Sequence, residues 1–246
     1  MASHWRWFHQ LGSPKWFFEN STKWLPWLWV IFFITLGFGL YYSLFASPQD
    51  YQQGHSVRIM YIHVPVAALS MVGYVAMAIA AVIGLVWKMK MAFAAARAIA
   101  PVGAAMTFLA LFTGAVWGKP TWGTWWEWDA RLTSELLLLF LYLGFIALHS
   151  SFSERAKADK AASVLAIVGV INVPIIYFSV KWWNTLHQGY SMTTKGALAP
   201  EMQTPLFIMI GAVYLLFAIL VIMRLRVEVI SREQKARWVR EWAEQE

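Results

Sequence analysis

Six stretches of 17 to 24 residues in this 246-residue sequence are apolar and almost free of charged side chains. The hydrocarbon core of a bilayer is about 30 Å thick, and about 20 helical residues cross it. Inside it every backbone polar group must be bonded within the protein, so only helices or closed barrels can cross. Barrel strands are shorter and alternate in polarity. The sequence therefore predicts an all-α integral membrane protein, a single membrane domain over residues 1–246. Its six transmembrane helices are expected at residues 24–45, 64–87, 99–117, 132–148, 161–180 and 205–223.

The composition excludes a water-soluble domain. Hydrophobic residues make up 59% of the chain and charged residues 13%, with a mean hydropathy of +0.52. Soluble proteins have about 25% charged residues. The chain has no cysteine, which excludes disulfides, thiolate metal sites and covalent c-type haem attachment. Any metal ligands must therefore come from the six histidines, the carboxylates or the methionines.

Positive charge is distributed unequally between the two sides of the predicted bundle. The N-terminal segment, the second and fourth connections and the C-terminal tail hold 15 Lys and Arg residues. The first, third and fifth connections hold five, namely Arg58, Lys119, Arg131, Lys181 and Lys195. Because positive residues are retained on the inner side, we expect both termini to be cytoplasmic and the three odd connections to face the periplasm. No small-residue cleavage site follows the N-terminal segment, which we expect to remain uncleaved.

The third connection, predicted at residues 118–131, belongs to a tryptophan-rich stretch. Five of the twelve residues from 117 to 128 are Trp, interrupted by Gly118, Pro120 and Gly123. Interfacial Trp residues can simply anchor a helix end in the membrane, but anchors come as one or two residues per end. A cluster of this density favours an aromatic surface for a large, flat, apolar ligand, because stacked and edge-on aromatic contacts add to the burial of apolar area.

Two histidines are predicted to lie near this surface. His63 precedes the second span and His187 follows the fifth. Imidazole is a common metal ligand, and two imidazoles from different helices could hold a haem iron from both faces. The alternative is two hydrogen-bonded structural histidines. Spacing alone supports a planar, apolar, metal-bearing ligand on the outward side. His149, at the inner end of the fourth span, is interpreted as an anchoring or capping residue.

Four cations are expected around the aromatic surface: Arg58, Lys119, Arg131 and Lys181. They suggest a ligand with an anionic edge, such as two propionates, because arginine pairs well with carboxylates. Local pairing is the alternative. Arg131 and Glu135 are four residues apart, and could bridge on one helix face. Asp129 could pair with Arg131 or cap the fourth span.

The order of these residues resembles a known signature. Trp122-Gly-Thr-Trp125-Trp126-Glu-Trp128-Asp129 is similar to the "WWD" motif of the haem-handling proteins of cytochrome c maturation, whose branches are CcmC, CcmF and CcsA. With His63 ahead of it and His187 after it, the stretch from about residue 50 to residue 223 resembles the small six-span CcmC branch. Glu127 departs from the pattern, at a position expected to be apolar, and we expect its side chain to point to solvent.

The resemblance implies a function and a set of partners. Such a protein binds haem b at the periplasmic face of the bacterial inner membrane and delivers it to the haem chaperone CcmE. It works with the ATPase subunit CcmA, the membrane subunit CcmB and the small subunit CcmD, and membrane lipid surrounds it. His63 and His187 match the axial iron ligands. The expected haem-binding residues are Trp122, Trp125, Trp126, Trp128, Asp129, Arg58 and Arg131.

The protein that the resemblance implies is a transport subunit and not an enzyme. The sequence contains no Walker motif, so no ATPase activity of its own is expected, and nothing in it indicates a nucleic-acid partner. Two other classes of membrane protein fit the sequence less well. A secondary transporter would carry polar residues at mid-span and broken helices, whereas Asn172 is the main interior polar residue. A quinone- or haem-binding electron-transfer subunit would place histidine pairs inside the bundle.

Overall fold

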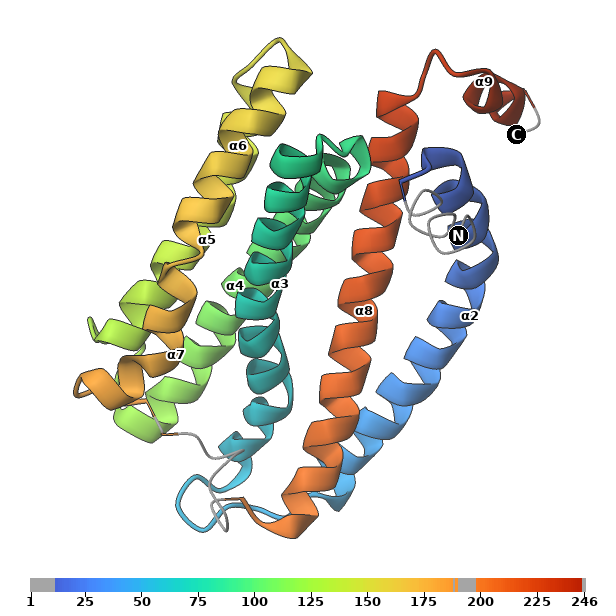
Figure 1. Ribbon diagram of the computed structural model, residues 1–246. Coiled ribbons are helices and arrows are strands. Elements are labelled where there is room, and N and C mark those ends of the chain that lie inside the picture. The colour runs from blue at the N-terminus through green and yellow to red at the C-terminus, as the bar shows by residue number, and fades with distance from the viewer. Residues whose placement is uncertain (1–11, 188, 190–197, 245–246) are drawn as a thin grey trace, which may run out of the picture.

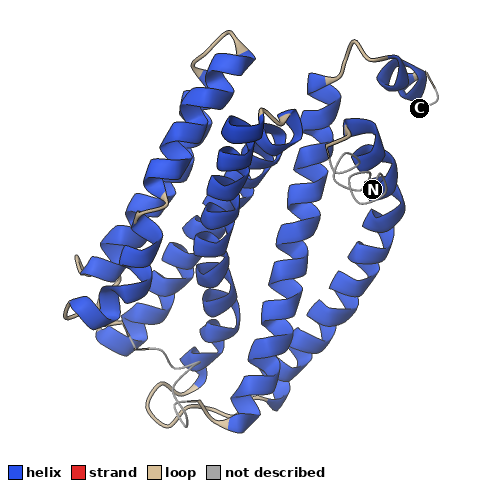
Figure 2. Ribbon diagram, in the orientation of Figure 1, coloured by secondary structure: helices blue, strands red, loops and turns tan. Residues whose placement is uncertain are grey.

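The computed structural model describes residues 12–187, 189 and 198–244 (Figure 1). All regular secondary structure in these residues is helical (Figure 2). Six of the helical segments are long and apolar enough to cross a membrane. The predicted fold class, an all-α membrane protein with six transmembrane helices, is confirmed. Lys195, one of the cations counted above, lies outside the described residues.

The helical segments cover the six predicted spans, except for a break at residues 170–171 in the fifth, and extend beyond them. In chain order the elements are α2 (Pro14–Tyr41), the π-helical turn η1 (Tyr42–Ala46), the 3-10 turn η2 (His55–Ile59), α3 (Met60–Trp87), α4 (Lys90–Trp122), α5 (Ala130–Ser150), α6 (Arg155–Gly169), α7 (Asn172–Trp182), α8 (Pro200–Arg232) and α9 (Arg237–Ala243). Hydropathy locates the apolar part of a span, whereas the helix continues through flanking Lys, Arg, Glu and Gln residues, which are good helix formers.

Helices α3 and α4 pack along each other in the middle of the bundle (Figure 1). Helices α5, α6 and α7 lie on one side of this pair, and α2 and α8 lie together on the other. Because successive spans alternate in direction, the start of α3, the end of α4, the start of α5 and the end of α7 meet at one end of the bundle. We call it the Trp-loop end, after the Trp loop at residues 123–129. The opposite end carries α9.

Two buried tyrosines fill the centre of the bundle. The hydroxyl of Tyr142 donates to the carbonyl of Ser70 at 2.9 Å, and its ring meets that of Tyr74 edge-on, with 4.9 Å between centroids. A Cβ atom at Gly103 would lie 2.3 Å from the Tyr142 ring, and one at Gly169 would lie 2.1 Å from the Tyr74 hydroxyl. The two glycines therefore let the helix backbones approach these rings.

The fifth predicted span is broken between α6 and α7. Pro174 has no N–H group to bond the carbonyl of Val170 four residues earlier. That carbonyl accepts instead from the N–H of Val173, at 3.0 Å. Asn172, at the start of α7, donates from its side chain to the carbonyl of Ser134 on α5 at 2.9 Å. The single helix expected at 161–180 is thus two helices, and α5 supports the junction.

A buried network of charged groups joins four helices at the α9 end. Asp159 on α6 accepts from His149 Nε2 of α5 at 2.9 Å and from both Nη atoms of Arg232 on α8, at 2.7 and 2.8 Å. Glu228 accepts from Arg232 Nε at 2.6 Å and from Arg97 Nη1 of α4 at 3.0 Å. His149 is therefore a member of a buried network, which differs from the anchoring or capping role predicted for it.

Candidate functional site

A cavity opens at the Trp-loop end between α3, α4 and α5. It encloses about 710 Å³ of empty space, much of it in its open mouth. Small and apolar residues of α4 form much of its wall. The titratable side chains that line it, among the described residues, are His63, Arg131, Glu135 and His187.

The two histidines lie close to each other in the wall of this cavity. Their ring centroids are 6.3 Å apart and the ring planes differ by 35°. Metal–imidazole bonds are about 2.0 Å long, and a ring centre lies about 1.1 Å beyond its nitrogen. A metal held between opposed imidazoles therefore separates the ring centres by about 6.2 Å. His63 comes from the first turn of α3 and is 9% exposed, and His187 comes from the loop after α7. Their spacing fits one metal ion between them.

One face of α4 holds the ring of His63. Thr113 Oγ1 lies 3.1 Å from His63 Nδ1. A Cβ at Gly114 would lie 3.1 Å from Cε1 of the same ring, and the Trp117 indole meets it edge-on at 5.7 Å. Sequence reasoning missed Thr113 and Gly114. The small residues Ala110, Gly114 and Gly118, four apart and lining the cavity, are the sequence signal that could have located this face.

The Trp loop is shorter than the predicted loop at 118–131, because α4 continues to Trp122. Pro120 is accommodated in the last turn, where Thr121 Oγ1 donates to the carbonyl of Trp117 at 2.7 Å. The helix ends at Gly123, whose φ of 81° suits glycine and whose N–H donates to the carbonyl of Lys119 at 3.1 Å.

Asp129 closes the Trp loop. Its Oδ1 accepts from the N–H of Leu132 at 2.8 Å and caps α5, so the capping alternative from the sequence is confirmed. Its Oδ2 accepts from the N–H of Leu186 at 3.3 Å. This second bond fastens the loop that carries His187 to the Trp loop. Direct contact between Asp129 and a ligand stays a prediction.

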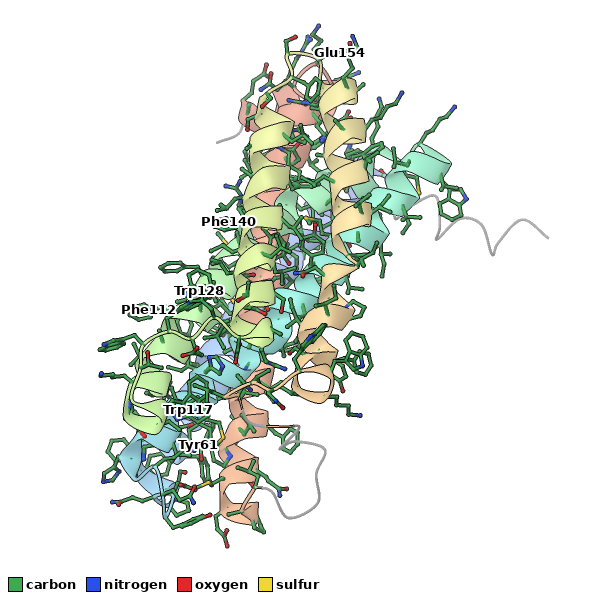
Figure 3. All side chains as sticks on the ribbon, turned by 90° about the vertical axis from the view of Figure 1, so that its left-hand side faces the viewer. Tyr61, Phe112, Trp117, Trp128, Phe140 and Glu154 are labelled. Carbon is green, nitrogen blue, oxygen red and sulfur yellow. The ribbon has the colours of Figure 1, made fainter. Side chains whose placement is uncertain are left out.

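The four predicted tryptophans divide into two pairs. Trp122 and Trp126 line the cavity, and Trp122 lies 6.1 Å from His187 between ring centroids. Trp125 is 57% exposed and Trp128 74% exposed. Figure 3 shows Trp128 on the flank that also carries Phe112 and Phe140, away from Trp117. The cavity wall among the described residues therefore uses Trp117, Trp122 and Trp126, and Trp125 and Trp128 lie outside it.

The predicted cations also separate. Arg131 lines the cavity, and its Nη1 donates to the carbonyl of Ile176 at 3.4 Å. Arg58 lies outside the described cavity wall, and its Nη2 donates to the carbonyl of Ser47 at 3.2 Å. Glu127 is exposed, as predicted for this departure from the motif. Arg131 is thus the arginine placed to meet an anionic group inside the cavity.

Two buried polar atoms of the cavity wall have no hydrogen-bond partner in the described part of the chain: Trp126 Nε1 and Glu135 Oε1. Glu135 is 8% exposed, although the sequence named it only as a possible partner of Arg131. Buried polar groups are nearly always bonded to protein, water or ligand. A molecule in this cavity therefore meets an indole donor and a carboxyl oxygen that the described part of the protein leaves available.

Comparison with known proteins identifies relatives over nearly the whole chain. The family model of heme exporter protein C matches residues 7–240. Heme exporter protein C of Escherichia coli K12 is 50% identical over 237 residues, 96% of each chain. The protein of that name from Haemophilus influenzae is 48% identical over 242 residues, 98% of each chain. That from Bradyrhizobium diazoefficiens is 49% identical over 228 residues, 92% of this chain and 86% of its own. With a family model and relatives that cover both the cavity and all six spans, the chain belongs to the heme exporter protein C family.

Proposed function

We propose that this protein binds haem b in the cavity at the Trp-loop end and delivers it for cytochrome c biogenesis. The observation that carries the proposal is the pair of neighbouring imidazoles in the cavity wall, His63 and His187, whose ring centres are 6.3 Å apart. His63 and His187 are the proposed axial ligands of the haem iron. Trp122 and Trp126 supply aromatic wall, and Arg131 supplies a cation for a propionate. An apolar macrocycle with a charged edge fits this combination.

The charge distribution supports a direction of delivery. The excess of Lys and Arg at the α9 end supports a cytoplasmic position for that end, and the cavity then faces the periplasm. We propose that the recipient is the periplasmic chaperone CcmE, and that the chain works beside CcmA, CcmB and CcmD in the inner membrane. The name of the relatives, heme exporter protein C, supports a transport subunit.

One observation could favour a secondary transporter, because α6 and α7 form a broken helix inside a span. The surroundings of the break do not suit an anionic substrate. The groove beside it is lined, among the described residues, by apolar side chains such as Ile79, Ile83, Ile167 and Val170. Asn172 already donates to the carbonyl of Ser134. The haem-handling assignment therefore has the better support.

Replacing His63 or His187 with alanine tests the proposed site. We expect the purified wild-type protein with haem to give sharp reduced α and β bands of a low-spin, six-coordinate iron. Each alanine variant should retain less haem or give a five-coordinate spectrum, because one axial nitrogen is removed. Added imidazole should restore the low-spin bands by occupying the vacated position.

The matched control for this experiment is His55→Ala. His55 is exposed on the same side of the bundle and bonds Gln49, 2.6 Å away. Its loss should leave the spectrum unchanged. If His63→Ala and His187→Ala both kept the wild-type spectrum, the two histidines would not be the axial ligands.

A second test concerns the propionates. Wild-type protein should bind haem more tightly than haem dimethyl ester, because the ester cannot form a charge-assisted bond with Arg131. Loss of such a bond is worth about 1.5–3 kcal/mol, or about 10- to 150-fold in affinity. We expect Arg131→Gln to abolish this discrimination, as measured by equilibrium titration of both ligands.

Arg58→Gln is the comparison variant. The sequence proposed both arginines as propionate partners, and the structure places Arg58 outside the described cavity wall. Arg58→Gln should therefore discriminate haem from its ester as the wild type does. The opposite pattern, with discrimination lost in Arg58→Gln alone, would transfer the role to Arg58.

A further inference from the structure

The side chain of Thr113 on α4 has more than one hydrogen-bond neighbour, but its hydroxyl has only one proton. Oγ1 lies 2.6 Å from the carbonyl oxygen of Leu109, which can only accept a hydrogen bond. Oγ1 also lies 3.1 Å from Nδ1 of His63. A second carbonyl, that of Ala110, is farther away, at 3.4 Å. The short contact assigns the hydroxyl proton to the backbone carbonyls of its own helix.

The assignment of that proton fixes the state of the imidazole. A threonine hydroxyl is one donor and two acceptors. With its proton directed at Leu109, Thr113 Oγ1 can only accept from His63, so Nδ1 of His63 carries a hydrogen. In a neutral imidazole the other nitrogen, Nε2, then has the free lone pair. The hydrogen-bond network, and not the ring alone, thus selects the tautomer.

The same face of α4 also fixes the orientation of the ring. Gly114 leaves room for Cε1 of His63, since a Cβ there would lie only 3.1 Å from that atom. The Trp117 indole meets the ring edge-on, and its Nε1 donates to the side chain of Gln53 at 2.8 Å. Rotation of the imidazole is therefore restricted by packing on one side and by the bond to Thr113.

We propose that Thr113 is a positioning residue, which holds His63 in its Nδ1-protonated form so that the Nε2 lone pair is presented to the haem iron. This inference rests on the proposed function. Partners that bond the outer nitrogen of a metal-bound histidine fix its tautomer and raise its basicity, and their loss costs about 10–100-fold in affinity. The residue acts through His63 and makes no contact of its own with the iron.

The test compares three variants of the full-length protein in detergent. Thr113→Val keeps the shape and removes the acceptor, and Thr113→Ser restores it. Thr107→Val is the matched control, because Thr107 lies on the same helix and makes the same kind of bond, to the carbonyl of Gly103 at 2.8 Å. Ferric haem affinity should fall about 10–100-fold in Thr113→Val and recover in Thr113→Ser. Thr107→Val should match the wild type.

The midpoint potential of the bound haem separates positioning from general loss of structure. A more basic imidazole stabilises the ferric iron, so loss of the acceptor in Thr113→Val should raise the potential. Thr113→Ser should return it to the wild-type value. Wild-type affinity and potential in Thr113→Val would overturn the proposal, and so would a serine variant as impaired as the valine variant.

A measurement without haem keeps this inference distinct from the proposed function. Nitrogen NMR of histidine-labelled apoprotein reports the tautomer directly, with the His63 signals assigned by their absence in His63→Ala. We expect a protonated Nδ1 and an unprotonated Nε2 in the wild type, and loss of this preference in Thr113→Val. An Nε2-protonated His63 in the wild type would contradict the inference. Failure of the wild type to bind haem at all would contradict the proposed function, and the tautomer would still be decided.

Discussion

Replacing Asp159 with asparagine is expected to lower the free energy of unfolding by about 3–5 kcal/mol, the usual cost of removing one partner from a buried ion pair. Asp159 is 7% exposed and accepts three bonds, one from His149 and two from Arg232. Asparagine has one acceptor oxygen in place of two and no charge. Arg232 would keep its charge in a site where 10% of its side chain is exposed, and Glu228 would be its remaining acidic partner.

Unfolding of the two proteins in mixed micelles, followed by circular dichroism against the fraction of denaturing detergent, measures this difference. Lys157→Ala is the control. Lys157 forms an ion pair with Glu154 at 2.8 Å, but their side chains are 70% and 56% exposed, and such pairs contribute about 0–1 kcal/mol. Equal stability of Asp159→Asn and Lys157→Ala would show that the buried network does not hold α5, α6 and α8 together.

Replacing Gly103 with alanine is expected to destabilise the bundle by about 1–3 kcal/mol or more, the cost of overpacking a filled core. The added methyl group would meet three atoms of the Tyr142 side chain at 2.3 to 2.4 Å. The ring cannot withdraw freely, because Tyr142 is fully buried and its hydroxyl is bonded to the carbonyl of Ser70. Helix α4 must therefore move away from α5.

A double-mutant cycle with Tyr142→Leu isolates this contact. Gly103→Ala should cost much less when the ring is already absent. Gly211→Ala is the matched control, since a Cβ at Gly211 on α8 meets no atom within 4 Å. Alanine there should be neutral or stabilise the helix by up to about 1 kcal/mol. If both glycine variants were equally stable, the close approach of α4 to Tyr142 would be disproved.

The spans could be predicted from the sequence because the bilayer requires about 20 apolar residues per helix. The ends of the helices could not be predicted, because hydropathy does not detect helical turns that continue into charged sequence. Glycine and proline signals were similarly ambiguous. Pro120 and Gly118 suggested a loop, yet α4 continues to Trp122. Pro174 does mark a break between α6 and α7. Proline has no N–H group for the carbonyl of Val170, which accepts from the N–H of Val173 instead.

The histidine pair could be predicted because both residues lie at span ends that alternation of direction brings together. The residues that form the cavity wall around the two histidines could not be predicted. Whether a tryptophan faces the cavity depends on the conformation of the loop between α4 and α5. The sequence therefore could not separate Trp122 and Trp126 from Trp125 and Trp128. Glu135 and Thr113 were not identified as cavity-associated residues, because their importance arises from contacts with α3, far away in sequence.

The pairing of α2 with α8 has a consequence for biosynthesis. The main neighbour of α2 in the bundle is α8, and about 160 residues separate the end of one from the start of the other. At a synthesis rate of about 5–20 residues per second, α2 waits about 10–30 s for its partner. During that interval the face of α2 that α8 later covers has no α8 to pack against, and this face includes Gly39, which lies beside Met209 of α8. Insertion of α8 is then the step that brings the earliest span into the bundle. In a chain truncated before α8, a crosslinker at position 39 should react with lipid, whereas in the full chain α8 covers that position.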